Sequence, residues 1–331
     1  MLRYMRKEKV IIIDMLNMYV RNFSAFAITN DNGNLVSGIY GSLASIRSQI
    51  EKHQADYAII AWEGEGSSER RRKTLKTYKE GRSFKGLNRK HFDYSQEDEK
   101  DSFARQLFLL KECLDELPIY QIGVRYLEAD DVIGYLCKKV LKDNYEKIII
   151  SSDKDYYQLV DESTTIFRPI KSKANPQGEY IDVEWMENKE KVYPPNHLLL
   201  KAVAGCTSDK IDGIAGVGEP TVLKDFPFLA EKKEYDVESL IEYSHQQKNK
   251  KYQKYIVNSD LIHKNKKLVQ LVDPDISMKS VDTIYNIMEK TKLKFNPPKF
   301  RIKLITEGIS PSNIDNWVGS FSTLKTNAIT L

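Results

Sequence analysis

Four short runs in the first half of the chain are apolar and rich in β-branched residues, with almost no polar position inside them. They read KVIIID, DYAIIAW, PIYQIG and EKIIISSD and occupy residues 9–14, 56–62, 118–123 and 146–153. Nearly continuous apolar runs of this length are typical of parallel strands that are buried on both faces. The pattern therefore predicts four buried strands.

Amphipathic helical patterns lie between these runs, at Ser37 to Lys52, Glu99 to Glu116 and Ala129 to Leu141. Strands that alternate with helices predict right-handed βαβ units in a mainly parallel sheet. After Pro194 the pattern becomes helical, with Lys-rich amphipathic segments from Asp236 onward. We expect an α/β domain at residues 1–190 and a helical region at residues 191–331.

Acidic residues follow each predicted strand at the point where the strand ends. Asp14 closes the first strand, Glu63 follows the second, and Asp153 and Asp155 follow the fourth. The third is followed by YLEADDVIGYL, which carries the acidic residues Glu128, Asp130 and Asp131. Because parallel strands direct their carboxyl ends to one edge of the sheet, we expect these acids to converge there.

Converging carboxylates need cations. Two unit charges about 4 Å apart repel by roughly 4 kcal/mol at an effective dielectric constant near 20. The chain has five histidines, none of them in these motifs, and oxygen ligands favour Mg²⁺ or Mn²⁺ over zinc. Two such ions about 4 Å apart form the arrangement that hydrolyses phosphodiesters. The alternatives are structural: Asp14 as a helix cap, and Asp130 and Asp131 as partners of a helix dipole.

Basic charge is concentrated in residues 69–90, ERRRKTLKTYKEGRSFKGLNRK, which hold ten Lys or Arg residues and two Glu residues. The segment starts at the edge that carries the acids. A flexible arch closing on a phosphate backbone would have this composition, and so would a solvated loop. Both interpretations stay open.

A glycine-rich turn, SDKIDGIAGVGEPTVLKDF, contains Gly213, Gly216 and Gly218 between two helical patterns. Its G-x-x-G-x-G spacing, with no strand before it, excludes the dinucleotide-binding fingerprint, and no G-x-x-x-x-G-K motif for a nucleoside triphosphate exists. Glycines allow close approach of a phosphate backbone. An ordinary interhelical turn is the alternative, although Asp209 and Asp212 add a further acidic cluster beside it.

Composition adds little. Among 331 residues, 51 Lys or Arg residues against 47 Asp or Glu residues give a net charge of +4, which is too small to indicate a nucleic-acid partner by itself. Cys113, Cys137 and Cys206 lie far apart, so neither a disulfide framework nor a zinc site is predicted. The sequence shows no signal-peptide core and no membrane span, and we expect a cytoplasmic protein.

Five stretches in order, IIIDMLNMYVR, YKEGR, LEADDVIGYL, ISSDKDYYQL and SDKIDGIAGVGEPT, resemble the structure-specific 5′-nucleases, or flap endonucleases, above all their bacteriophage members. The likeness runs from Val10 to about Leu223, with a weaker match at NPPKFRIKL. Each motif alone is weak, but five in order are specific. The resemblance implies a PIN-like nuclease domain, a helical arch at about residues 64–100, and a helix-three-turn-helix motif at about residues 196–226 that grips duplex DNA.

The resemblance also implies roles for the acidic residues. Carried over by position, the first metal site would be surrounded by Asp14, Glu128, Asp130 and Asp131. The second would be built from Asp153, Asp155, Asp209 and Asp212. Two departures affect this assignment: Glu63 stands where the family usually has Asp, and SDKIDG replaces the commoner G-D-x-x-D-N. Glu63 would then act through water or shift the metal preference.

Basic and turn residues receive roles in the same way. Lys79 and Arg82 would reach the scissile phosphate and stabilise its developing charge. The expected DNA contacts are Arg21, Arg71, Lys73, Lys76, Lys79, Arg82, Gly213, Gly216, Val217, Gly218, Thr221 and Lys224. Family members often hold a potassium ion at the helix-three-turn-helix motif, so K⁺ is an expected second kind of ion.

The resemblance implies a Mg²⁺-dependent 5′-3′ exonuclease or flap endonuclease, with Mn²⁺ as a substitute, that uses two ions. It would remove RNA primers or flaps from branched or nicked duplex DNA and RNA–DNA during replication. We expect a monomer without a membrane partner, in the host cytoplasm if the source is a phage, recruited by a single-strand-binding protein or a sliding clamp. The rival functions are a PIN-type ribonuclease that cuts single-stranded RNA and a catalytically silent DNA-structure binder.

Overall fold

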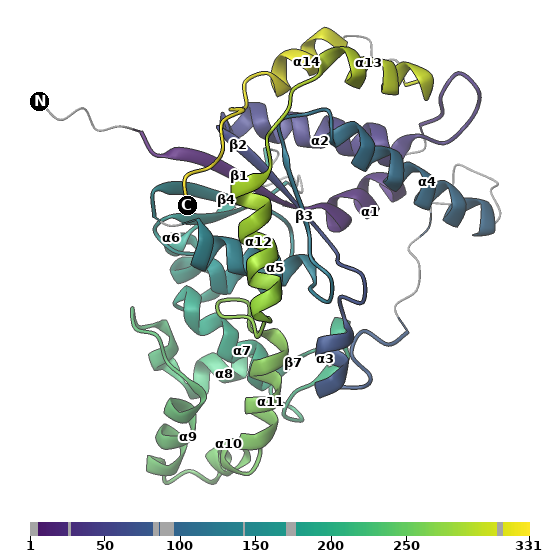
Figure 1. Cartoon of the computed structure of the whole chain (residues 1–331). Coiled ribbons are helices and arrows are strands. Elements are labelled where there is room, and N and C mark those ends of the chain that lie inside the picture. The colour runs from purple at the N-terminus through teal and green to yellow at the C-terminus, as the bar shows by residue number, and fades with distance from the viewer. Residues whose placement is uncertain are drawn as a thin grey trace, which may run out of the picture.

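A six-stranded sheet forms the centre of the molecule (Figure 1). The structure is a computed structural model and describes residues 6–25, 28–81, 86, 96–141, 143–169, 177–309 and 314–331. The strands are β1 (Glu8–Asp14), β2 (Tyr57–Trp62), β3 (Tyr120–Gly123), β4 (Tyr145–Ile150), β5 (Thr164–Arg168) and β6 (Glu179–Ile181). Their order is β3-β2-β1-β4-β5-β6, with only β6 antiparallel to its neighbour. The four predicted strands are thus confirmed as β1 to β4, and the mainly parallel α/β sheet is confirmed with them.

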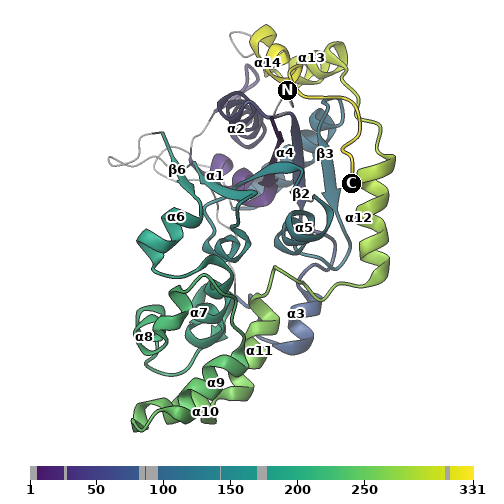
Figure 2. The ribbon, with the colours of Figure 1, turned by 90° about the vertical axis from the view of Figure 1, so that its left-hand side faces the viewer.

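Each face of the sheet is buried under helices, which explains the continuous apolar runs. Val10 and Ile12 of β1 pack on one side, while Ile11 and Ile13 pack on the other. The second side is covered by α1 (Met15–Ala25), α2 (Ser37–His53), α4 (Gln96–Leu114), α13 (Pro297–Thr306) and α14 (Ile314–Phe321). The first is covered by α5 (Ala129–Tyr135) and α12 (Met278–Lys290), which lie on the opposite side of the sheet in Figure 2.

The predicted helix at Ala129 to Leu141 is not regular throughout. It is α-helical as α5 and continues as a π-helical turn over Leu136–Val140. The buried ammonium of Lys147 donates hydrogen bonds to the carbonyl oxygens of Cys137 at 3.1 Å and Leu141 at 3.0 Å. These bonds stabilise the wider turn, because they satisfy carbonyl groups at a helix end that would otherwise be buried without partners.

The strand order reverses between β1 and β4, since the chain proceeds from β1 to β2 and β3 on one side and then returns to β4 and β5 on the other. A crevice opens at such a reversal, outside the carboxyl ends of the two strands. Asp14 ends β1, and Asp153 follows β4 by three residues. The fold therefore places these two acids on either side of one crevice.

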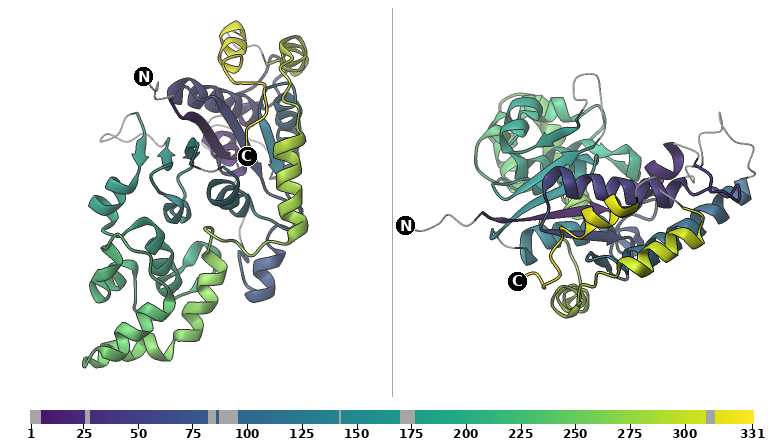
Figure 3. Two further views of the ribbon diagram at one scale, coloured as in Figure 1. Left: turned by 60° about the vertical axis from the view of Figure 1, so that its left-hand side comes forward. Right: turned by 90° about the horizontal axis from the view of Figure 1, so that it is seen from above.

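A helical region extends beyond the carboxyl edge of the sheet (Figure 3). Its α-helices are α6 (Val183–Trp185), α7 (His197–Ala204), α8 (Glu219–Asp225), α9 (Val237–Gln246), α10 (Gln253–Val257) and α11 (Ser259–Val269). A two-stranded ribbon of β7 (Gly205–Cys206) and β8 (Ile211–Asp212) follows α7. Short 3-10 turns occupy Lys154–Leu159, Pro194–Asn196, Thr207–Asp209, Pro227–Ala230 and Lys250–Tyr252, and a second π-helical turn occupies Met186–Glu190.

The C-terminal tail returns to the amino ends of the strands. The backbone N–H of Lys325 donates to the carbonyl of Asp56 at 2.9 Å, and that of Ile329 donates to the Tyr120 hydroxyl at 3.1 Å. These contacts cover the edge opposite the acidic residues. Across the described ranges, none of the helices has both the length and the apolar character needed to cross a membrane.

Candidate active site

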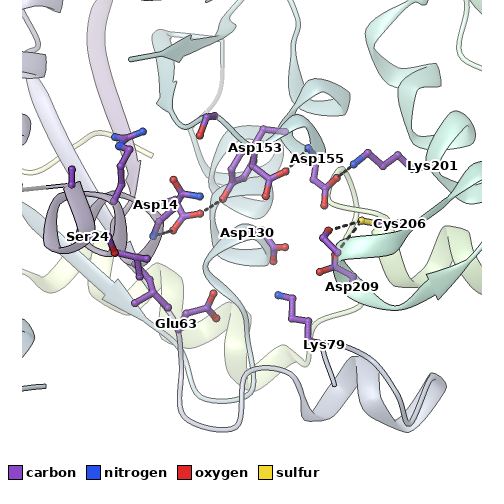
Figure 4. A pocket seen from close by; sticks show the side chains of 18 of the residues that line it. Asp14, Ser24, Glu63, Lys79, Asp130, Asp153, Asp155, Lys201, Cys206 and Asp209 are labelled. Carbon is purple, nitrogen blue, oxygen red and sulfur yellow. Dashed lines mark hydrogen bonds and ion pairs between the residues drawn. The ribbon is translucent and has the colours of Figure 1, made fainter. Parts of the chain in front are cut away.

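A cavity of about 800 Å³ lies at the carboxyl edge of the sheet, between the sheet and the helical region (Figure 4). Its lining includes six acidic residues, namely Asp14, Glu63, Asp130, Asp153, Asp155 and Asp209. Three basic residues, Arg21, Lys79 and Lys201, lie among them. The predicted convergence of acids at one edge is therefore found, although with a membership that differs from the prediction.

Asp14 is held rigidly at the end of β1. Its Oδ1 accepts a hydrogen bond from the backbone N–H of Asn17 at 3.1 Å, and its Oδ2 accepts one from the Tyr156 hydroxyl at 3.1 Å. The first bond is the helix-cap interaction that the structural alternative predicted, yet the carboxylate also lines the cavity. Burial raises the pKa of Asp14, and the nearby negative charge of Asp130 adds to this effect.

Glu63 directly follows β2 and points into the cavity (Figure 4). Its Oε2 is buried and makes no hydrogen bond within the part of the chain that the structure describes. Burial, followed by the negative charges of Asp130 and Glu128, raises the pKa of Glu63 to about 7. A buried carboxylate oxygen without a partner is costly, and a bound cation would remove that cost.

The three acids of YLEADD lie at the start of α5, where their side chains point in different directions. Glu128 is the N-cap residue, and its backbone N–H donates to Oδ2 of Asp131 at 3.2 Å. Glu128 and Asp131 are 1% and 0% exposed and do not line the cavity, whereas Asp130 does. Successive residues of a helix start point in different directions, so one short stretch supplies both a cavity wall and a buried anchor.

Arg71 of α3 (Glu69–Thr74) forms ion pairs with all three of these acids. It forms an ion pair with Glu128, and its guanidinium lies 3.3 Å from Oδ1 of Asp130 and 2.9 Å from Oδ1 of Asp131. Arg70 adds a second ion pair to Asp131 at 2.6 Å. Burial would raise the pKa of Asp130, but the positive charges of Arg71 and Lys79 outweigh it and hold that pKa below its usual value.

This network departs from the sequence-based expectations. Glu128 and Asp131 were expected to surround a metal, and Arg71 was expected to contact DNA. The structure instead buries all three, with Arg71 only 2% exposed, because the charges neutralise one another inside the protein. The start of the predicted arch is therefore a packed element that fixes the base of the cavity.

Lys79 follows this packed segment in the chain and lines the cavity. The preceding Tyr78 is buried in an apolar cluster with Leu198 and Leu268. Lys79 adopts a left-handed backbone conformation with φ of 53°, and its N–H donates to the carbonyl of Asp209 at 3.0 Å. Farther along the segment, Arg82 lies outside the described residues, as do residues 83–85 and 87–95 of the expected arch. Lys73 and Lys76 are exposed and do not line the cavity.

Asp153 and Asp155 follow β4 and face the cavity from its other side (Figure 4). Oδ1 of Asp153 accepts the backbone N–H of Asp155 at 2.9 Å, and Lys201 of α7 forms an ion pair with Oδ1 of Asp155. Desolvation by surrounding atoms, followed by the charge of Asp155, raises the pKa of Asp153 to about 6, although the side chain reaches solvent.

Cys206 of β7 and Asp209 of the 3-10 turn between β7 and β8 also line the cavity. Cys206 was not among the site residues expected from the sequence. The Cys206 thiol lies 3.6 Å from Oδ2 of Asp209 and 3.1 Å from the Ser208 hydroxyl. Ligand atoms of Asp155, Cys206 and Asp209 all lie within 4.8 Å of one another. The C-x-x-D spacing of Cys206 and Asp209 was the signal in the sequence that could have identified Cys206 as a candidate ligand. Asp212, expected at the same site, is exposed and does not line the cavity.

The glycine-rich turn connects α7 to α8 beside this ribbon. Gly213 is required for packing, since a Cβ there would lie 2.1 Å from the carbonyl oxygen of Ala204. Gly216 has φ of 73° and no neighbouring atom within 4 Å of such a Cβ, which leaves its backbone open. Val217 is buried, Thr221 is half-buried, and Gly218 and Lys224 are exposed. Gly216, Gly218 and Lys224 are thus open to solvent, whereas Gly213 and Val217 mainly shape the turn.

The donors around the cavity fit divalent cations. Asp14, Glu63, Asp130 and Asp153 supply carboxylate oxygens, which hard ions such as Mg²⁺ prefer. The buried Oε2 of Glu63 is an independent sign, because it makes no hydrogen bond within the described residues. On its other side the cavity offers Asp155, Asp209 and the softer sulfur of Cys206.

Comparisons with known proteins identify relatives. Residues 9–191 match the family described as 5′-3′ exonuclease, N-terminal resolvase-like domain. The chain is 29% identical over 219 residues to the thermostable DNA polymerase I of Thermus thermophilus, an alignment that covers 66% of this chain and 24% of the relative. The chain therefore spans about a quarter of the length of that protein.

Two solved structures share the fold along most of the chain. The bacteriophage T5 flap endonuclease in a complex with DNA and metal ions has a TM-score of 0.61 at 19% identity, covering 92% of this chain and 100% of that one. The T5 5′-exonuclease with bound zinc has a TM-score of 0.60 at 18% identity, covering 95% of this chain and 98% of that one. The predicted flap-endonuclease fold is confirmed by these matches.

Proposed function

We propose that this chain, which belongs to the 5′-3′ exonuclease family defined by the N-terminal resolvase-like domain, is a metal-dependent 5′-nuclease. It would hydrolyse phosphodiester bonds in branched or nicked duplex DNA and in RNA–DNA, and so remove primers or flaps during replication. The observation that carries the proposal is the convergence of six acidic residues on one cavity beside Lys79. Their mutual repulsion is strongly unfavourable without bound cations.

The acids divide into two groups that would hold the ions. We propose that Asp14, Glu63, Asp130 and Asp153 hold one ion and that Asp155 and Asp209 hold the other, which moves Asp153 from the second site implied by the resemblance to the first. Divalent ions at these positions would make a bound water more acidic and stabilise negative charge on the reacting phosphate. We propose Mg²⁺ as the natural ion, Mn²⁺ as its substitute and two ions per site, with K⁺ at the glycine-rich turn.

The protein's own cations would position the scissile phosphate. Lys79 points into the cavity toward its acidic residues (Figure 4), and Arg21 of α1 also lines the cavity. Both can contact phosphate oxygens without becoming ligands of an ion. Glu128 holds the Lys79 ammonium at 2.8 Å before substrate enters, so that the charge is already in place. We assign the same task to Arg82.

Exposed basic and glycine residues would bind the rest of the duplex. Lys73 and Lys76 are exposed on the surface, while Gly216, Gly218 and Lys224 lie on the turn and α8. Backbone contacts of this kind read no sequence, which suits an enzyme that recognises the shape of a junction. The T5 flap endonuclease complex with DNA, which shares the fold, supports this arrangement.

A labelled duplex with a single-stranded 5′ flap tests the proposal. The full chain with Mg²⁺ should release the flap, and omission of Mg²⁺ should abolish cleavage but preserve binding. Cleavage of unstructured RNA without preference for the junction would support the PIN-type ribonuclease instead. Binding without cleavage in Mg²⁺ and in Mn²⁺ would support the silent DNA-structure binder.

The setting of the enzyme forms part of the same proposal. We propose a monomer acting in the cytoplasm, that of the host if the source is a phage, and recruited by a single-strand-binding protein or a sliding clamp. A pull-down of either partner with and without a flap substrate tests this recruitment.

A further inference from the structure

We infer that Cys206 is a metal ligand, and that Asp155, Cys206 and Asp209 form a site for a thiophilic divalent cation such as Zn²⁺ or Co²⁺. This inference deepens the proposed function, since it concerns the second group of ligands in the same cavity. It goes beyond that function by assigning a sulfur ligand, and with it a different metal preference, to a site whose other members are carboxylates.

The three donors are already near the spacing that a tetrahedral site needs. Cys206 Sγ lies 3.6 Å from Oδ2 of Asp209. Bonds of about 2.0 Å to oxygen and 2.3 Å to sulfur at a tetrahedral angle put the two donors about 3.5 Å apart. The three ligand atoms lie within 4.8 Å of one another, so a small side-chain rotation of Asp155 would complete the set.

Three separate elements bring these donors together. Asp155 comes from the turn after β4, Cys206 from β7 and Asp209 from the 3-10 turn that precedes β8. The ribbon between β7 and β8 fixes Cys206, since Gly205 pairs with Asp212 and Cys206 pairs with Ile211. Figure 4 shows the thiol directed toward Asp209 at the wall of the cavity, and the rest of the side chain packs against the apolar cluster that contains Leu198 and Leu268. The other two cysteines, Cys113 and Cys137, are buried in the hydrophobic core.

Charge balance agrees with a bound cation. Lys201 pairs with Oδ1 of Asp155, and Oδ2 of that carboxylate makes no hydrogen bond within the described residues. Binding through Oδ2 would therefore leave the Lys201 ion pair in place. A cation would also replace the weak thiol contact to Asp209 with a bond to sulfur, and the thiol proton would be released on binding.

The sulfur ligand determines the metal preference. Thiolates select zinc, cobalt and cadmium, whereas Mg²⁺ prefers carboxylate oxygens and water. The remaining acids, Asp14, Glu63, Asp130 and Asp153, supply oxygen donors only. One cavity thus presents a hard group of ligands beside a group with soft character, and the two groups should take up different ions.

Absorption spectroscopy with Co²⁺ alone tests the inference on the full chain without DNA. Titration of the wild-type protein should produce the near-ultraviolet band that arises from charge transfer between thiolate and cobalt, and added Zn²⁺ should remove it. Cys206→Ser and Cys206→Asp should lack the band. Asp212→Asn is the matched control, because Asp212 is an acid of the same ribbon outside the cavity, and it should retain the band.

Calorimetry supplies a second measurement. Loss of an outer partner of a metal ligand already costs about 10- to 100-fold in affinity, so Cys206→Ser should weaken Zn²⁺ binding by at least that factor. Mg²⁺ affinity should stay nearly unchanged in this variant. A wild-type protein without the band at saturating Co²⁺, or a band that persists in Cys206→Ser, would overturn the inference.

The flap assay keeps this inference separate from the proposed function. Cleavage by a protein that shows no thiolate band would refute the Cys206 site and leave the nuclease intact. A thiolate band in a protein that cuts no nucleic acid would support the Cys206 site and refute the proposed nuclease function.

Discussion

The ammonium of Lys79 lies 2.8 Å from Oε2 of Glu128, beneath the acidic cavity. Glu128 is itself buried and bound to Arg71, so it cannot follow a departing lysine. The Lys79 backbone is fixed as well, through its N–H bond to the Asp209 carbonyl. Lys79 is therefore a preorganised cation at the cavity wall, which is the property that stabilises charge during a reaction.

Replacement of Lys79 by Ala should lower the cleavage rate far more than DNA affinity. Loss of one preorganised donor costs on the order of 100- to 1,000-fold in kcat. Single-turnover cleavage and equilibrium binding of the flap duplex measure the two effects. Lys76→Ala is the control, because Lys76 is exposed outside the cavity and should affect binding only. Equal losses of rate and affinity in Lys79→Ala would indicate simple electrostatic anchoring.

Asp153→Asn and Asp155→Asn should leave DNA binding largely intact while hydrolysis falls on the order of 100-fold or more, since even outer partners of metal ligands cost 10- to 100-fold. Amide groups keep the shape of the side chain but lose the charge that holds a cation. Asp212→Asn, on the exposed part of β8, should cleave at the wild-type rate. Unchanged cleavage by both cavity variants would reject their assignment as ligands.

Arg71→Met should destabilise the protein strongly. Arg71 is 2% exposed and neutralises Glu128, Asp130 and Asp131 together, and removal of one partner from a buried ion network costs about 3–5 kcal/mol. Urea unfolding measures the loss. The exposed Lys73→Met on the same helix should change the free energy of unfolding by no more than about 0.5 kcal/mol. Similar stabilities of the two variants would contradict the structural role of Arg71.

His197 makes stability depend on pH. The ring is 0% exposed, and neither nitrogen makes a hydrogen bond within the described residues. Burial, followed by the charge of Lys201, lowers the pKa of His197 to about 3, whereas the unfolded chain takes up this proton near pH 6.5. The folded state favours the neutral ring, so its contribution is complete above pH 6.5 and is lost as the pH falls toward 3.

The expected slope is about 1.4 kcal/mol per pH unit for one proton. Urea unfolding between pH 7 and pH 4 measures the free energy of unfolding of His197→Phe and of the wild type. The quantity of interest is the value of the variant minus that of the wild type at each pH. The difference should shift in favour of the variant as the pH falls. His245→Phe, at an exposed position of α9, is the matched control. A difference that does not change with pH would refute the prediction.

Lys224→Ala on α8 should weaken DNA binding without changing the cleavage rate of bound substrate. Loss of one phosphate contact should reduce the slope of log affinity against log salt by about 0.9. Fluorescence anisotropy at several salt concentrations measures this slope. Lys290→Ala, on the exposed face of α12, carries the same charge change away from the turn and should leave the slope unaltered. Identical slopes for wild type and Lys224→Ala would exclude the turn region from the DNA path.

The central strands and their acidic ends were predictable from the sequence. β1, β2 and β4 are largely buried on both faces, so their runs are almost continuously apolar, and parallel pairing of β1 to β4 sends the carboxyl ends of the strands to one edge. β5 and β6 were not predicted, since three of the five residues of β5 are polar and β6 has only three residues. No local pattern in the sequence predicted that the C-terminal tail returns to Asp56 and Tyr120.

The sequence by itself determined the four central strands, the edge at which the acids gather and the helices between those strands, because hydrophobic periodicity is a local property. Only the tertiary structure decided which acids face the cavity. Glu128, Asp130 and Asp131 lie within four consecutive residues, yet the turn of α5 and the approach of Arg71 bury Glu128 and Asp131 and leave Asp130 at the cavity. Cys206 meets Asp155 across a gap of about 50 residues because β4 and the ribbon of β7 and β8 converge. Side-chain direction and long-range approach depend on packing of the whole chain, which no single motif encodes.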